Sequence, residues 1–222
     1  MATFKVEHSE GMRWLKVGLV DDDVRTERGA LNHLRGDVVL DVPWPSLRSW
    51  WVSLFSDESL LRPRYSGTGT VYLDSTLGSY HVMKVQAGER WILDRRCFWA
   101  SDGEVKLSIH RERMLTAFWA GQGLIWYKTA LKGEGQVALS VDGPVEEFSL
   151  ENDRLVTDGP FVIAHTSGIS LRVRRPARSL VSCWLSGQRY LLSYEGTGKL
   201  LLCTTPYWRA RMQAQPSALT AE

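Results

Sequence analysis

Apolar and polar residues alternate with a period of two in several short segments of the chain. This alternation is typical of strands with one buried face. The clearest examples are Val71–Leu73, Val105–Ile109, Val137–Val141 and Ile169–Val173. Asp-Gly and Ser-Gly pairs separate such segments at intervals suited to hairpins. The pattern predicts an all-β fold, a β-sandwich or double-stranded β-helix-like architecture.

A Gly-x-Gly pair that opens an apolar strand pattern occurs three times, in steps of 66 and 63 residues. The pairs are Gly67 and Gly69, Gly133 and Gly135, and Gly196 and Gly198. Apolar anchors recur at a similar spacing, at Leu31, Phe98 and Val162. Acids stand four residues before each anchor, at Glu27, Asp94 and Asp158. We therefore predict a pseudo-threefold internal repeat with units at about 14–79, 80–144 and 145–205.

The three predicted units are expected to share one core, because no Pro/Ser-rich linker separates them. This predicts a single β domain over residues 1–205. The polar segment 206–222 is rich in small residues, and we expect it to form a flexible C-terminal tail.

Aromatic residues gather in the segments that connect the predicted strands, and only these segments suit short helices. The first connector is the most aromatic and contains Trp44, Trp50, Trp51 and Phe55. Such side chains either plug the ends of the β core or face another subunit, a protein partner or a membrane surface. These four residues form the candidate interaction surface, and we expect another copy of the chain to cover part of it.

The glycine pairs are predicted to be structural rather than phosphate-binding. Gly196-Thr-Gly-Lys199 lacks the leading glycine of a phosphate loop, and Leu200 stands where Ser or Thr is needed. Glycine at the start of a strand permits a bulge or a close approach of two backbones. All six glycines named above are assigned this role.

Composition limits the chemistry that the chain can support. The formal charge is +2, which gives little reason to expect nucleic acid as a partner. The three cysteines have no CxxC spacing, and the five histidines have no metal-ligand spacing. No nucleophile motif is present. We therefore expect no catalytic residue, no metal and no cofactor.

The acids Glu27, Asp94 and Asp158 allow two interpretations. They are either three carboxylates around the predicted pseudo-threefold axis or ordinary turn residues, and the flanking Gly and Arg residues favour turns.

Several of these segments together resemble a known family. The relevant segments are Glu27–Leu31, Ser66–Leu73, Phe98–Ser101 and Gly133–Val137. They look like the altered inheritance of mitochondria protein 24 family, over about residues 14–205. The resemblance implies a β-sandwich similar to the tryptophan RNA-binding attenuation protein, and it brings no established catalytic residues. Mitochondrial members are linked to inner-membrane organisation.

These observations predict a non-enzymatic oligomeric scaffold or interaction protein, linked by the resemblance to membrane organisation. The alternative is a ligand- or RNA-binding protein that uses the attenuation-protein-like fold. The charged N-terminal segment contains no signal sequence, and no apolar run is long enough to span a membrane. We expect a cytoplasmic protein of bacterial type, with peripheral membrane association as a further option.

Overall fold

Two antiparallel sheets make up the described part of the chain. The computed structural model describes residues 2–42, 62–76, 78–111, 127–174 and 191–204. Within these ranges the chain forms fourteen strands and no helix. The all-β prediction is confirmed, and the paired sheets are consistent with a β-sandwich. The predicted connector helices and the C-terminal tail lie outside the described residues.

The first sheet is built around two long strands that pair along most of their length. The strand order is β3-β4-β2-β7-β10-β5, and β1 pairs with β2 beside this path. The strands are β1 (Thr3–Ser9), β2 (Met12–Thr26), β3 (Leu31–Asp41), β4 (Arg64–Thr76), β5 (Ser79–Val85), β7 (Phe98–Asp102) and β10 (Gly135–Val141).

The second sheet has the order β11-β14-β12-β6-β9-β8, and β13 pairs with β14 beside this path. Its strands are β6 (Arg90–Leu93), β8 (Lys106–Arg111), β9 (Tyr127–Lys132), β11 (Val145–Thr157), β12 (Val162–Thr166), β13 (Ile169–Arg174) and β14 (Leu191–Cys203). The middle of the chain therefore contributes to both sheets, with β5, β7 and β10 in the first and β6, β8 and β9 in the second.

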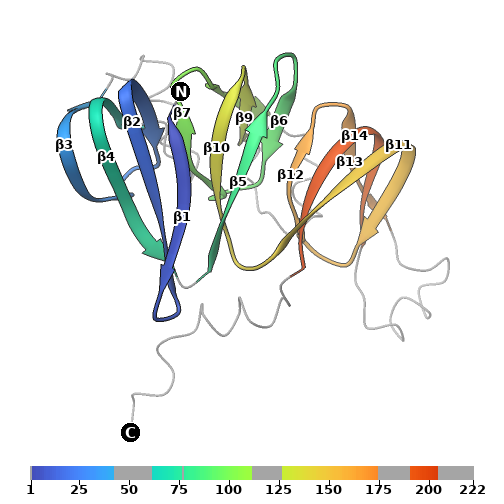
Figure 1. Ribbon diagram of the computed structural model, residues 1–222. Helices are drawn as coiled ribbons and strands as arrows, with labels where there is room; N and C mark the ends of the chain where they lie inside the picture. Colours follow the sequence, from blue (N-terminus) through green and yellow to red (C-terminus); the bar gives the residue numbers. More distant parts are fainter. Residues whose placement is uncertain (1, 43–61, 77, 112–126, 175–190, 205–222) are drawn as a thin grey trace, which may run out of the picture.

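The strands form an open row in which the first and last parts of the chain lie at opposite ends. Figure 1 shows β3 at one end of the molecule and β11 at the other. Each of these two strands is the terminal member of its sheet path. The predicted pseudo-threefold repeat is therefore not supported as a closed arrangement, because pairing between the described strands joins neighbours in the row and does not join its two ends.

β2 and β11 each continue past a β-bulge as a single long strand. The register against the partner strand shifts between Leu19 and Asp22 in β2, and between Leu150 and Asp153 in β11. At these shifts Asp21 and Asn152 adopt left-handed φ angles of 49° and 53°. Asp and Asn tolerate this conformation better than most residues.

The buried side chains form three clusters along the row. The first lies under β1, β2 and β4 and includes Leu15, Val17 and Val71. The middle cluster contains Phe98 and Leu131 among others, and so joins β7 of the first sheet to β9 of the second. The third lies under β11, β13 and β14. The middle cluster thus holds the two sheets together through apolar burial.

Candidate interaction surface

The aromatic residues predicted to form the interaction surface are Trp44, Trp50, Trp51 and Phe55, and they lie outside the described residues. The strand that leads into their segment is described, and it is β3. Within the described part of the chain β3 pairs with β4 on one side only. Its outer edge therefore presents unpaired backbone groups, the usual template for pairing with another strand.

The C-terminal half of β3 also exposes apolar side chains. Val39 is 62% exposed, Leu40 is 49% exposed, and Val42 just beyond the strand is 47% exposed. Val38, in contrast, packs against the first core cluster. Exposed apolar side chains on an open sheet edge are a common mark of an interaction site. We refer to Val39, Leu40 and Val42 as the β3 apolar end.

The close approach of the β3 and β4 backbones explains Gly67 and Gly69 of β4. A Cβ on Gly67 would lie 2.2 Å from the carbonyl oxygen of Asp37, and one on Gly69 would lie 2.4 Å from that of Arg35. Gly67 also has a φ of 130°, which side chains rarely allow. The backbones of β3 and β4 can therefore come this close together only because Gly67 and Gly69 lack a side chain.

The other predicted structural glycines occupy comparable positions. Positive φ angles are found at Gly133, Gly135, Gly196 and Gly198. A Cβ on Gly135 would lie 2.9 Å from the Cβ of Asp102, and one on Gly196 would lie 2.2 Å from the carbonyl oxygen of Gly168. The geometry at each position leaves little or no room for a side chain.

Two of the three aligned acids pair with buried bases that the sequence analysis did not identify. Arg62 Nη2 lies 3.7 Å from Glu27 Oε2, and Lys128 Nζ lies 3.4 Å from Asp94 Oδ1. Both basic side chains are only 7% exposed. Each base stands five residues before the first glycine of its pair, a spacing that could have revealed them.

These acids also stand at turns. The carbonyl of Glu27 accepts a hydrogen bond from the Ala30 N–H at 3.2 Å, and that of Asp94 accepts one from the Cys97 N–H at 3.4 Å. The residues thus combine a turn with an ion pair. Asp158 also lies in a bend, directly after β11.

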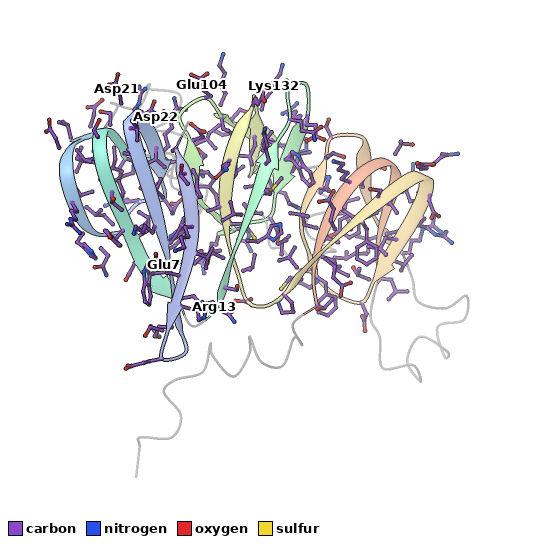
Figure 2. The ribbon with its side chains drawn as sticks, viewed as in Figure 1. Glu7, Arg13, Asp21, Asp22, Glu104 and Lys132 are labelled. Carbon is purple, nitrogen blue, oxygen red and sulfur yellow. The ribbon has the colours of Figure 1, made fainter. Side chains whose placement is uncertain are left out.

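An acidic hollow of about 590 Å³ lies where β7 ends, lined by Asp22, Asp102, Glu104, Lys106, Gly133 and Glu134. Figure 2 shows Asp22 and Glu104 along the same, upper edge of the row of strands. Asp102 is fully buried, and burial, reinforced by the nearby charge of Asp22, raises the pKa of its carboxyl. Within the described residues no group of three His, Cys, Asp or Glu side chains is arranged to hold a metal ion.

A second hollow, of about 510 Å³, lies beside the turn between β6 and β7. Arg95, Arg96, Phe161 and the buried thiols Cys97 and Cys203 are among its lining residues. Arg96 adopts a left-handed φ of 60°, an uncommon conformation for a long side chain. The third cysteine, Cys183, lies outside the described residues.

Comparison with known proteins identifies the family. The family model described as Mitochondrial biogenesis AIM24 matches residues 4–205, which is most of the chain. The chain belongs to the AIM24 family. The resemblance noted in the sequence is thereby confirmed. In the described part of this AIM24 chain, no helix is long and apolar enough to cross a membrane.

The fold is also found in a solved structure. The AIM24 chain is similar to the crystal structure of the protein SPYM3_0169 from Streptococcus pyogenes, with a TM-score of 0.70 and 15% sequence identity. The match covers 96% of this chain and 98% of that one. At this level of identity the likeness concerns the fold alone. The sequence matches none of the curated proteins with which it was compared.

Proposed function

We propose that this AIM24 chain is a non-enzymatic oligomeric scaffold that assembles through the open edge of β3 and the aromatic segment that follows it. The observation that supports this proposal most directly is the β3 apolar end, where Val39, Leu40 and Val42 are all about half exposed or more. These residues lead directly into the segment that contains Trp50 and Trp51. Exposed apolar side chains on an open strand edge favour a site of contact with another chain.

The repeated units, the cytoplasmic location and the link to membrane organisation belong to the same proposal. A scaffold that binds at a membrane needs an apolar or aromatic surface that can enter the interface, and tryptophan is well suited to that position. The first connector provides three tryptophans for this purpose, Trp44, Trp50 and Trp51.

The test replaces Trp50 and Trp51 together with Ser and, in a second variant, Val39 and Leu40 with Ser. Each double variant should lower the assembly mass measured by light scattering while far-UV circular dichroism still reports β structure. Val20→Ser is the matched control, because Val20 is 81% exposed but lies on β2 rather than on an edge strand. Retention of full assembly in both double variants would contradict the proposal.

Two further measurements distinguish the other possible positions of Trp50 and Trp51. Loss of liposome binding with assembly intact would assign Trp50 and Trp51 to a membrane surface. Unfolding of the Trp50/Trp51 double variant would assign them to the core.

The alternative function is ligand or RNA binding. The hollow beside Arg95 and Arg96 favours an anionic ligand with an apolar part, since its lining combines these two arginines with Phe161 and Val141 and contains one acid, Asp142. A salt titration distinguishes RNA from a small ligand, because phosphate contacts along a strand give a steep dependence on salt concentration. Tight, steeply salt-dependent RNA binding by a monomeric chain would replace the scaffold proposal.

A further inference from the structure

Two strand junctions connect successive parts of the row, and they have the same register. In the first, Val24–Thr26 of β2 pair with Ala100–Asp102 of β7, so that Thr26 lies opposite Ala100. In the second, Trp91–Leu93 of β6 pair with Ala164–Thr166 of β12, so that Leu93 lies opposite Ala164. Thr26 and Leu93 each directly precede an aligned acid, and the two alanines each stand two residues after an apolar anchor.

Matching backbone hydrogen bonds close both junctions at one end. The N–H of Glu27 donates to the carbonyl of Trp99 at 2.7 Å, and the N–H of Asp94 donates to the carbonyl of Ile163 at 2.7 Å. The two acceptors occupy equivalent places, because the register of β7 shifts at Trp99 and that of β12 shifts at Ile163.

The opposite ends of the junctions match as well. The N–H of Gly103 donates to the carbonyl of Asp23 at 3.1 Å, and the N–H of Ser167 donates to that of Arg90 at 2.9 Å. Each junction is therefore the same short antiparallel ladder of three residue pairs, closed by one backbone bond at each end.

Each internal junction pairs the end of one strand, just before an aligned acid, with the start of another strand, at an apolar anchor. The chain contains one more strand segment of each kind, and these two segments lie at the two ends of the row. β11 ends with Leu155–Thr157 directly before the acid Asp158, as β2 ends before Glu27. β3 begins at the anchor Leu31, with the register shift at Asn32, as β7 begins at Phe98. In the described part of the chain, β11 pairs with β14 and β3 with β4, and their outer edges are open.

We propose that β11 of one copy of this chain pairs with β3 of the next, in the register of the two internal junctions. Thr157 would then lie opposite His33, Val156 opposite Leu34, and Leu155 opposite Arg35. The N–H of Asp158 would donate to the carbonyl of Asn32. This inference rests on the proposed assembly and specifies its partner, a second copy, and its contact.

Side-chain exposure independently supports this register. Val156 is 41% exposed and Leu34 is 36% exposed, and the register places these two side chains opposite one another. At the corresponding positions of the internal junctions, Ser101 is fully buried, Ile92 and His165 are 4% and 5% exposed, and Arg25 is half-buried. A second copy would therefore cover the surface that the internal junctions cover elsewhere.

The contact is head-to-tail, because it joins two different edges of the chain. Heterologous contacts of this kind generate closed rings or open filaments rather than twofold dimers. One end of each copy would always present the β3 edge and the other the β11 edge.

Cysteine cross-linking between two single variants tests the register. In the proposed ladder Leu34 and Val156 form a hydrogen-bonded pair, since the neighbouring pair two residues along is bonded, and the Cα atoms of such pairs lie about 5.5 Å apart. That separation is suitable for a disulfide. Full-length Leu34→Cys and Val156→Cys are mixed and oxidised, and we expect a disulfide-linked dimer from the mixture but from neither variant alone.

Val39→Cys mixed with Val156→Cys is the matched control. Val39 is exposed on the same strand but lies five residues from Leu34, about 17 Å away in an extended strand. The unsubstituted chain serves as a blank for the native thiols, and circular dichroism checks that each variant is folded. Cross-linking of the Leu34 and Val156 pair no greater than in this control would overturn the proposed register. So would efficient linking of Leu34→Cys to itself, which indicates a twofold contact.

Light scattering of the unsubstituted chain separates the two proposals. An assembly whose Leu34 and Val156 variants do not cross-link contradicts the β11–β3 contact and leaves the scaffold function in place. A monomer contradicts both.

Discussion

The guanidinium carbon of Arg62 lies 3.9 Å from the centre of the Phe98 ring. Arg62 also donates a hydrogen bond from Nη2 to Thr129 Oγ1 at 3.0 Å and faces Glu27 at 3.7 Å. Phe98 belongs to the first sheet and Thr129 to the second. One buried side chain thus connects the turn after β2 with both sheets.

Replacement of Arg62 with Met should therefore lower the free energy of unfolding by about 1–3 kcal/mol. The change removes the hydrogen bond and leaves Glu27, which is 24% exposed, without this cation. Urea denaturation followed by tryptophan fluorescence measures the loss.

Arg64→Met is the control for this change. Arg64 is 45% exposed and makes two hydrogen bonds to Asp23, at 2.7 and 2.8 Å, so solvent screening of the exposed guanidinium limits this pair to about 1 kcal/mol. If both substitutions lower the free energy of unfolding equally, burial of the Arg62 guanidinium adds nothing to stability.

A Cβ at Gly135 should destabilise the fold. Gly135→Ala places that atom 2.9 Å from both Asp102 Cβ and Val105 Cγ2, at a φ of 152°. We expect a loss of about 1–3 kcal/mol. Gly18→Ala is the matched control, since Gly18 also lies in a strand and the nearest atoms to its added Cβ are 4.0 Å away. If both variants melt at the same temperature as the unsubstituted chain, the close-approach interpretation is wrong.

The buried carboxyl of Asp102 should make stability depend on pH. Because the folded state raises its pKa, the folded chain binds this proton more tightly than the unfolded chain does. Stability from this group is present at low pH and falls as the pH rises from the unfolded value of about 4 to the raised folded value.

Asp102→Asn removes this dependence. The variant should melt at a higher temperature than the unsubstituted chain at pH 7, and the difference should shrink as the pH falls toward 4. Glu151→Gln, at an exposed position of β11, is the control and should leave the profile unchanged. A variant that melts below the unsubstituted chain at pH 7 would show that the ionised carboxylate stabilises the fold.

The strands could largely be predicted from the sequence, because half-buried strands show their period directly. The alternation at Val137–Val141 and Ile169–Val173 corresponds to β10 and β13. The glycine pairs were also visible, since the close approach of Gly67 to Asp37 leaves glycine as the fitting residue.

The division of the middle unit between two sheets could not be predicted. It depends on which strand lies beside which, and β7 pairs with β2 while β6 pairs with β12 at some distance in the sequence. The spacing before the glycine pairs could have marked Arg62 as a recurring base, but not its partner Glu27, because the two residues are 35 positions apart and only the fold brings them together.

The mass of the unsubstituted chain in solution tests the central claim of assembly most directly. Multi-angle light scattering at micromolar concentration should give a multiple of the 25.2 kDa chain mass, since the open edges of β3 and β11 are covered only when copies associate. A single species at 25.2 kDa, unchanged as concentration rises, would contradict the account.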